Sequence, residues 1–178
     1  MSVQSSATTL HGAHAATTMI KTRNDQAPSV RQKIADLLND RLADGLNLQL
    51  QLKQAHWNIK GPDFIQIHEL FDAVWRRVVE HNDEMAERIA QIGGLVEGTV
   101  EIIAKKTELK RYPTGVTAGH EHVINVANAL ASFAEEIRRA IDTAHKDGDA
   151  VTTDLLTKVC GQLDKDLWFV EAHLQAKS

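Results

Sequence analysis

The chain has 178 residues, of which 43% are hydrophobic and 25% charged, and its formal net charge is −4. This length suits one domain with a sizeable core, and the negative balance argues against a protein whose whole surface binds nucleic acid. Aromatic residues make up only 4% of the chain, which favours helices over a β-sandwich.

The single cysteine, Cys160, excludes an intrachain disulfide framework and is compatible with a reducing compartment. The N-terminal region lacks an apolar core long enough for a secretory signal. No uninterrupted apolar stretch approaches the roughly 20 residues that a membrane span needs. We therefore expect a cytoplasmic protein with no membrane contact.

Residues 1–27 are rich in Ser, Thr, Ala and His, show no period, and are predicted to form a flexible N-terminal tail. His11 and His14 in this tail either bind a transition metal loosely or have no special role. The positive residues up to position 33 are Lys21, Arg23, Arg31 and Lys33, against the single acid Asp25. This region is therefore weakly basic, on an otherwise acidic chain.

A first helix is predicted from Pro28, since proline suits a helix start, to about Ile59. One stretch fits a strand as well, because the leucines of residues 46–52 alternate with polar residues. We favour a helix there, as Leu, Gln and Lys are good helix formers and no turn signal interrupts the run. Apolar residues on several faces would suit a helix that packs both in its own bundle and against a neighbour.

Gly61 and Pro62 end the first helix before a second helix begins. Asp63 is expected to cap that helix, with Gln66 completing a capping box. The helix then runs without a breaker to Gly93, which makes it roughly 45 Å long at about 1.5 Å per residue.

Residues 95–117 are a long connection with a short helix at about 100–105, and two further helices span about 118–146 and 150–174. Four long helices with one long middle connection predict an all-α, up-down four-helix bundle over residues 28–175 with a crossover between its halves.

The second helix carries two polar pairs at a spacing of four residues, namely His68 with Asp72 and Asp83 with Glu87. All four side chains point roughly the same way, at about 100° per residue. Asp72 and Asp83 are nevertheless about 16 Å apart along a straight helix, whereas metal–ligand bonds are about 2 Å. One copy of this helix therefore cannot close both pairs around one metal ion.

Two copies can do so if they pack antiparallel about a two-fold axis near residues 75–79. His68 of one copy then faces Glu87 of the other, and Asp72 faces Asp83, which gives two equivalent sites. Imidazole and carboxylate suit Fe(II), Mn(II) or Zn(II), and His56 at the end of the first helix is a third protein ligand. The alternative is that these residues are solvated surface groups, which is the usual role of acids spaced in this way.

Several motifs of this chain resemble the Dps family (DNA-binding protein from starved cells), the miniferritin branch of the ferritin-like proteins, over about residues 30–175. The matching residues are Lys53-Gln54-Ala55-His56-Trp57-Asn58, Gly61, Phe64, His68-Glu69, Asp72, Asp83, Ala86-Glu87-Arg88, the segment 106–113 and the segment 163–169. No Glu is followed three residues later by His, the motif of the larger bundle di-iron proteins.

The resemblance implies a ferritin-like four-helix bundle with a short extra helix in the middle connection, assembled as a hollow homododecamer. It implies ferroxidase centres at two-fold interfaces that oxidise Fe(II), commonly with hydrogen peroxide and also with oxygen, and a ferric mineral stored inside the shell. His56, His68 and Asp72 would come from one subunit, and Asp83 and Glu87 from its partner. Iron is the expected metal, with zinc as a surrogate, and the expected role is protection against oxidative damage.

Three further features are less specific. Asp147, Asp149 and Asp154 lie where the family has acidic three-fold pores, or they are a charged loop and a helix cap. Trp57, beside His56, is expected near the centre, where it shields the centre, intercepts radicals or is an interface aromatic.

The alternative function is a DNA-binding, nucleoid-compacting protein with incidental metal binding, although the tail is only weakly basic. A dodecamer would raise the avidity of such tails. A third possibility is a purely structural bundle whose acids are solvated.

Overall fold

The computed structural model describes residues 19–175, and these residues form five helices. The helices are α1 (Pro28–Asn58), α2 (Phe64–Gln91), α3 (Val100–Lys106), α4 (Gly119–Lys146) and α5 (Ala150–Gln175). Within the described range the only strand-like pairing is an isolated bridge between Lys60 and Ala118. The all-α prediction is confirmed, and each predicted helix has its counterpart within a few residues.

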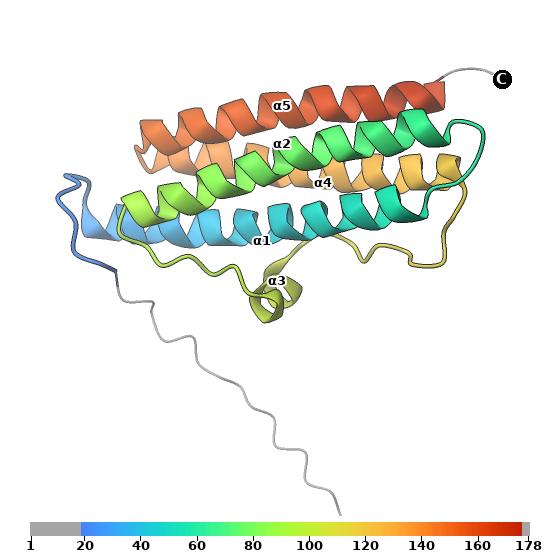
Figure 1. Ribbon diagram of the computed structural model, residues 1–178. Coiled ribbons are helices and arrows are strands. Elements are labelled where there is room, and N and C mark those ends of the chain that lie inside the picture. Colours follow the sequence, from blue (N-terminus) through green and yellow to red (C-terminus); the bar gives the residue numbers. More distant parts are fainter. Residues whose placement is uncertain (1–18, 176–178) are drawn as a thin grey trace, which may run out of the picture.

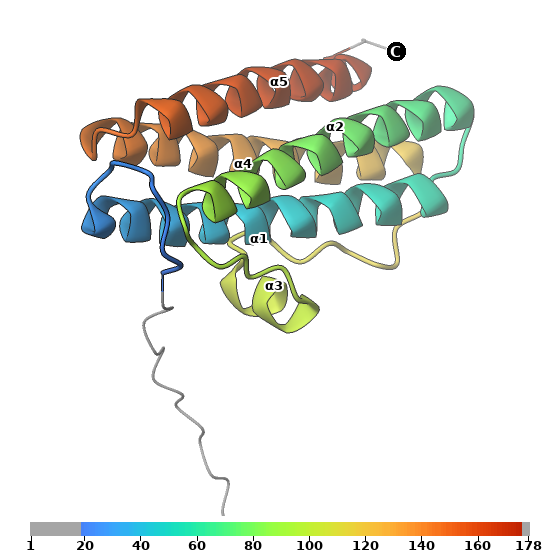
Figure 2. The ribbon, with the colours of Figure 1, turned by 60° about the vertical axis from the view of Figure 1, so that its left-hand side comes forward.

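The four long helices form two antiparallel hairpins, α1–α2 and α4–α5 (Figure 1). Helix α1 packs against both α2 and α4, and α5 packs against α4 and α2, so that the apolar faces of all four meet in one core. The connection from α2 to α4 crosses the outer side of α1 and places α3 there (Figure 2). This is the predicted bundle with a crossover between its halves.

The leucine-rich stretch of α1 is helical, as predicted. Leu48 and Leu52, one helical turn apart, are fully buried, whereas Leu50 lies on the outer side with 57% of its surface exposed. Burial of one leucine side chain contributes about 1.5–3 kcal/mol, so the inward pair holds α1 in the bundle. The outward leucine belongs to an apolar surface that one chain does not cover.

The turn between α1 and α2 is held against the segment that precedes α4. The backbone amide of Lys60 donates to the carbonyl of Thr117 at 2.9 Å, and the amide of Gly119 donates to the carbonyl of Lys60 at 3.0 Å. These bonds fix the ends of α1 and α2 relative to the start of α4.

The predicted capping box at the start of α2 is not formed. Asp63 occupies the N-cap position, but its side chain makes no capping hydrogen bond. Its backbone lies at φ −95° and ψ 20°, outside the extended region from which an N-cap side chain reaches the first amides. The amide of Ile67 instead donates to the backbone carbonyl of Asp63 at 3.2 Å. The predicted position of the cap was right, and the predicted side-chain bond was wrong.

The other end of α2 is anchored from within the bundle. The Arg88 guanidinium donates to both carboxylate oxygens of Asp149 at 3.0 Å and to Thr152 Oγ1 at 3.0 Å, and all three residues are buried. Gly93 then turns the chain with φ +85°, and its carbonyl accepts a bond from the Ile20 amide at 2.7 Å.

The segment before α1 is therefore attached to the bundle at the end of α2. Met19 packs against the core, and the buried Arg31 donates to the carbonyl of Ile92 at 2.9 Å. The predicted tail spans residues 1–27, and the structure places its last part, residues 19–27, beside the bundle. His11 and His14 lie outside the described residues.

Helices α1 and α2 approach each other closely at Gly45. A Cβ atom built there would lie 2.0 Å from Asn82 Oδ1. The buried Asn82 also donates to Gln49 Oε1 at 3.2 Å, so it is held in place. The absence of a side chain at position 45 therefore sets the spacing of the hairpin that carries the candidate site.

Candidate metal centre

His56 and His68 form a stacked pair across the α1–α2 hairpin. Their ring centroids are 3.6 Å apart and their planes differ by 20°. Each Nδ1 is 2.9 Å from the backbone carbonyl of the other residue. Because a carbonyl can only accept, each Nδ1 carries a proton and each Nε2 keeps its lone pair in the neutral ring. A backbone partner on one ring nitrogen is the usual way in which a metal-binding histidine is oriented.

Asp72 lies one turn beyond His68 and is held by two cations. Its carboxylate accepts bonds from the Lys53 ammonium and from the Arg76 guanidinium. The Lys53 hydrogen bond and charge, together with Arg76, hold the pKa of Asp72 below its usual value, although partial burial opposes this shift. The side chain is ionised and ready to bind a cation, but two protein cations already occupy it.

A hollow of about 470 Å³ opens beside these residues, and it is lined by His56, Ile65, His68, Glu69, Asp72 and Arg76. The structure thus brings three of the five predicted ligands to one place. Imidazole and carboxylate groups around an open hollow are the donor set that divalent first-row metals accept.

Asp83 and Glu87 lie further along α2, and both side chains are exposed. Among the described residues, neither carboxylate takes part in a hydrogen bond or an ion pair, whereas the intervening Glu84 is bound by His81 and Lys158. A second hollow, of about 450 Å³, lies beside Asp83, and it is lined by Leu42, Leu46, Gln49, Val79, Glu80, Asn82, Asp83, Ala86, Val96 and Gly98.

Within the described residues of one chain, no group of three or more His, Cys, Asp or Glu side chains is placed to hold a metal ion. The two ligand pairs of α2 are about 16 Å apart at the helical rise, and His56 joins the first pair from the end of α1. One chain therefore presents two incomplete clusters, as the spacing predicted.

Exposed apolar side chains lie beside the histidine cluster. Trp57, next to His56, has 70% of its surface exposed, and Phe64 and Ile65 are 41% and 52% exposed. Such aromatic and aliphatic groups in one region typically mark a protein–protein contact. Trp57 lies next to the histidine pair in sequence, and its ring faces solvent in the single chain.

The three acids proposed for a pore differ in availability. Asp154 is exposed, and Asp147 accepts a bond from Lys33 Nζ at 2.7 Å. Asp149 is fully buried, caps the first turn of α5 through Thr152, and pairs with Arg88. Its burial alone would raise its pKa, but the bonds from Thr152 and Arg88 lower it. Asp149 is therefore part of the fold, and only Asp147 and Asp154 keep a carboxylate that a pore can use.

Sequence reasoning missed Lys53 and Arg76 as partners of Asp72. The signal was available, because Lys53 lies three residues before His56 and Arg76 four residues after Asp72, on the same helical faces. It also missed the buried pair of Tyr112 and His122, whose phenolic oxygen and Nδ1 are 2.7 Å apart. No sequence pattern reveals that contact, since it depends on the path of the crossover.

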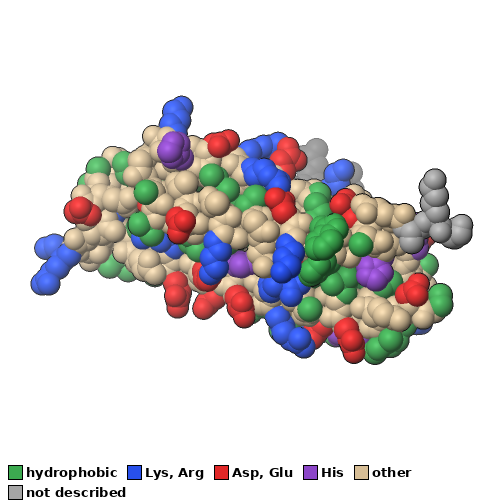
Figure 3. Space-filling view, turned by 90° about the horizontal axis from the view of Figure 1, so that it is seen from above, with side chains coloured by type: hydrophobic (Ala, Val, Ile, Leu, Met, Phe, Trp, Pro, Cys, Tyr) green, Lys and Arg blue, Asp and Glu red, His purple; other side chains and the backbone are tan. Residues whose placement is uncertain are grey.

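The upper face of the bundle carries acidic and basic side chains intermixed, with apolar side chains gathered toward one end (Figure 3). This face offers no continuous basic band of the kind that nucleic-acid binding requires. None of the described helices is long and apolar enough to cross a membrane.

Comparison with known proteins places the chain in a family. Residues 35–177 match the ferritin family model, described as a ferritin-like domain. The chain is 41% identical over 158 residues to the DNA protection during starvation protein of Agrobacterium fabrum, a match that covers 89% of this chain and 98% of the relative. It is 36% identical over 143 residues to the protein of that name from Mycolicibacterium smegmatis, covering 80% of this chain and 78% of the relative.

A solved structure has the same fold. The tetragonal form of Mycobacterium smegmatis Dps superposes with a TM-score of 0.83 at 34% identity, covering 89% of this chain and 96% of that one. A match to most of the chain in sequence and in structure identifies the fold and the relatives together. The chain belongs to the Dps family, the miniferritin branch of the ferritin-like proteins.

Proposed function

We propose that the protein is a ferroxidase and iron store whose metal sites are each shared between two subunits. The observation that carries the proposal is a pair of incomplete clusters: one joins His56 of α1 to His68 and Asp72 of α2, and the other, further along α2, has two carboxylates that no described residue pairs. Each cluster supplies what the other lacks.

The outward stripe of α2 supports a two-fold arrangement. The midpoint between His68 and Glu87 is also the midpoint between Asp72 and Asp83. An axis at that midpoint, within residues 75–79, brings each histidine cluster of one subunit onto the carboxylate cluster of the other when the helices run antiparallel.

The two hollows on α2 follow the same symmetry. Glu69, Asp72 and Arg76 line the first hollow, and their symmetry-related positions, Ala86, Asp83 and Val79, line the second. These positions alternate between three and four residues apart, the spacing at which two helices pack side by side at a small angle. The exposed apolar side chains around both hollows would be covered in the same contact.

The chemistry follows from the donor set. His56, His68, Asp72 and the partner's carboxylates would bind Fe(II) as substrate, and the cluster leaves positions open for an oxidant. Two Fe(II) ions give up one electron each to hydrogen peroxide, which takes up two protons and becomes two water molecules. Iron oxidation would thereby remove peroxide without releasing hydroxyl radicals, and the Fe(III) would be stored as mineral.

Storage requires a closed shell, and we propose a dodecamer built from the two-fold contact and from three-fold contacts near Asp147 and Asp154. These acids would attract Fe(II) to a pore. Light scattering should then give a mass of roughly twelve times the 19.7 kDa of one chain. We place the protein in the cytoplasm.

A second candidate function is DNA binding, favoured by the names of the relatives, which are DNA protection during starvation proteins. The charges offer it less support. Arg31 is buried against Ile92 and Lys33 is paired with Asp147, so of the four cations expected near the tail only Lys21 and Arg23 are exposed and unengaged within the described residues. A gel shift at increasing salt separates the two functions, because phosphate contacts weaken steeply with salt.

Subunit mixing tests the shared centre. One variant, His68→Ala/Asp72→Ala, lacks the histidine cluster, and a second, Asp83→Ala/Glu87→Ala, lacks the carboxylate cluster. Each alone should lose Fe(II) oxidation, followed by absorbance with peroxide or oxygen. In a mixed dimer one site carries both defects and the other site is intact. Random pairing of the two variants in equal amounts makes about half of the dimers mixed. Co-expression should therefore restore about a quarter of the wild-type rate.

The control for mixing is His68→Ala/Asp72→Ala co-expressed with itself under a second tag, which should restore nothing. Zn(II), which cannot be oxidised, should compete with Fe(II) in the wild-type protein. Mixed assemblies that stay inactive would contradict the shared site. Unchanged oxidation in His68→Ala/Asp72→Ala would contradict the assignment of the centre itself.

A further inference from the structure

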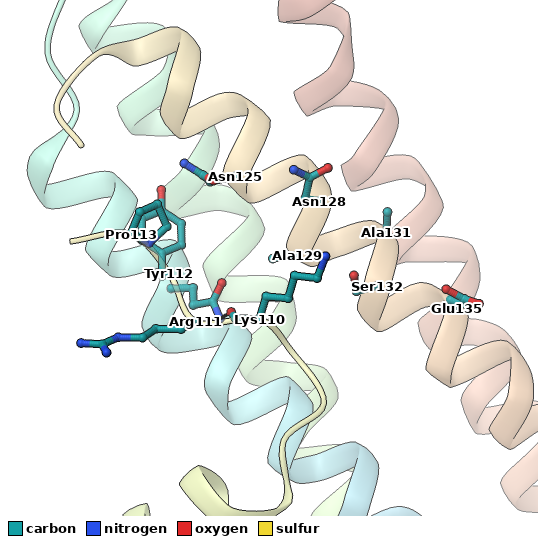
Figure 4. Close-up of a pocket in the computed structure, with 11 residues that line it drawn as sticks. Lys110, Arg111, Tyr112, Pro113, Asn125, Asn128, Ala129, Ala131, Ser132 and Glu135 are labelled. Atoms are coloured by element: carbon teal, nitrogen blue, oxygen red, sulfur yellow. Dashed lines mark hydrogen bonds between the residues drawn. The ribbon is translucent and has the colours of Figure 1, made fainter. Parts of the chain in front are cut away.

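Tyr112 and His122 form a buried pair near the end of α1, the helix that carries His56. Tyr112 lies in the connection between α3 and α4, at the end of a groove that runs along α4 (Figure 4). It is 8% exposed, and His122, in the first turn of α4, is fully buried. The phenolic oxygen is 2.7 Å from His122 Nδ1, and the rings are nearly parallel, with an interplanar angle of 14°.

The pair is neutral, with the proton on the phenol. Burial raises the pKa of Tyr112 above its usual value and lowers the pKa of His122. The Tyr112 hydroxyl therefore donates to the lone pair of Nδ1. His122 Nε2 is buried and has no hydrogen-bond partner among the described residues. A ring present only for packing would have both nitrogens satisfied or would be apolar, since an unpaired buried donor costs about 1–3 kcal/mol.

Three groups around His122 partly offset the effect of burial, although the pKa of His122 stays below its usual value. The backbone carbonyls of Val116 and Asn58 and the carboxylate of Glu121 all oppose the fall in the pKa of His122. They lie on the crossover, at the end of α1 and on α4 respectively. The carbonyl oxygens and the carboxylate would stabilise the positive charge that proton transfer from Tyr112 places on the ring.

The pair lies close to the candidate centre along the chain. Asn58, whose carbonyl lies near His122, is two residues beyond His56, which corresponds to about 3 Å of rise along α1. The hydrogen bonds of Lys60 to Thr117 and of Gly119 to Lys60 join the same segments. Backbone contacts thus join the end of α1, which carries His56, to the segment that holds Tyr112 and His122.

We propose that Tyr112 is a one-electron donor to the iron centre, with His122 as the acceptor of its phenolic proton. This inference rests on the proposed ferroxidase function. Reduction of hydrogen peroxide to water needs two electrons, and a centre that holds a single Fe(II) ion supplies only one. Tyr112 supplies the second electron, its O–H bond breaks, and the proton passes to His122 Nδ1.

The step balances with two protons from solvent. The O–O bond of peroxide breaks and two water molecules form, while Fe(II) becomes Fe(III), Tyr112 becomes a neutral tyrosyl radical and His122 becomes imidazolium. The half-loaded centre therefore completes the reduction of peroxide and releases no hydroxyl radical. Transfer of the proton within the pair avoids a tyrosyl radical cation, and the positive charge moves to His122, beside the carbonyls of Val116 and Asn58 and the carboxylate of Glu121.

The composition of the chain makes the test specific, because Tyr112 is its single tyrosine. The assembled wild-type protein is loaded with one Fe(II) per subunit, mixed with hydrogen peroxide, freeze-quenched and examined by electron paramagnetic resonance. We expect a tyrosyl signal that narrows when the protein contains ring-deuterated tyrosine. This labelling needs no substitution, so it does not depend on a variant that folds.

Variants then localise the signal. Tyr112→Phe should abolish it, and His122→Gln should reduce it several-fold, with the fold of each checked by circular dichroism and melting temperature. Trp168→Phe, which alters an aromatic side chain 60% exposed on α5, is the matched control and should leave the signal unchanged.

Iron oxidation without a tyrosyl signal would overturn this proposal alone. A radical that responds to deuterated tryptophan instead would also overturn it, in favour of a residue such as Trp57. Absence of iron oxidation in the wild-type protein would overturn both this proposal and the ferroxidase function.

Discussion

The first half of α2 uses its outward polar groups within the subunit, whereas the second half does not. His68 exchanges hydrogen bonds with His56, and Asp72 is bound by Lys53 and Arg76. Asp83 and Glu87 face solvent on the same stripe, and no described residue pairs with them. The two halves have similar chemistry but differ in how much of it the isolated chain satisfies.

On the proposed function, this difference would separate side chains that build the subunit from side chains that serve a partner. Two carboxylates four residues apart on a helix repel each other by about 0.2–0.5 kcal/mol. Their unpaired state therefore costs stability and gives nothing to the single chain. We infer that the cluster in the first half of α2 is organised before assembly. The carboxylates in the second half would complete a metal site only after assembly.

The largest effect is expected at the inward side of the second half, where Arg88 anchors α2 to Asp149. Asp149→Ala leaves a buried guanidinium without its partner and should lower the free energy of unfolding by about 3–5 kcal/mol. Urea unfolding followed by circular dichroism measures this change. The exposed acid Asp154 is the control, and Asp154→Ala should stay within about 0.5 kcal/mol of the wild type. Equal effects of the two substitutions would contradict the assignment of Asp149 to the fold.

A smaller effect is expected in the first half, from Lys53→Met. The folded-state pKa of Asp72 is lowered from 3.8, so the pair with Lys53 stabilises the fold above that pH and is lost as the pH falls through the folded-state pKa. The substitution should cost about 1 kcal/mol at pH 7 in metal-free protein. The difference in melting temperature from the wild type should shrink as the pH is lowered below 3.8.

Lys110→Met is the matched control for this pH dependence, because Lys110 is exposed and the described residues include no ion pair of its side chain. Its melting temperature should follow that of the wild type at every pH. A Lys53→Met curve that keeps a constant offset down to pH 2 would show that Lys53 acts through packing on Trp75, whose ring lies 4.2 Å from its Nζ.

The smallest effect is expected at the exposed acids. Asp83→Asn/Glu87→Gln removes their repulsion and should raise the free energy of unfolding of the metal-free protein by about 0.2–0.5 kcal/mol, while Fe(II) oxidation is lost. Glu108→Gln, at an exposed acid in the connection after α3, should change neither quantity. A clear loss of stability in the double variant would mean that these acids already serve the subunit, and the contrast between the two halves of α2 would fail.

The helices could be predicted from the sequence because their signals are local. Pro28 and Gly93 mark a start and an end, and the apolar spacing of α2 and α4 is that of a helix with one buried face. The sequence predicted the position of the cap at Asp63 but not the absence of its side-chain hydrogen bond. That bond depends on the backbone angles of Asp63, which the surrounding turn imposes.

The candidate site was predictable as far as it lies on one helix. The spacing of His68, Asp72, Asp83 and Glu87 gives both clusters and their separation. Contacts between distant segments gave no such signal. Asp149 resembles a loop acid in the sequence, and its partner Arg88 is 61 residues away. The structural role of Asp149, which follows the turn at Gly148, depends on the buried Arg88 that contacts it.

The close approach of α1 and α2 couples the residues allowed at positions 45 and 82 in evolution. A larger residue at 45 is tolerated only if Asn82 also changes, since the two cannot both fill the space between α1 and α2. Homologues should therefore show covariation of these positions, with bulk on one helix exchanged for bulk on the other. Such an exchange would leave the separation of His56 and His68, further along the same hairpin, unaltered.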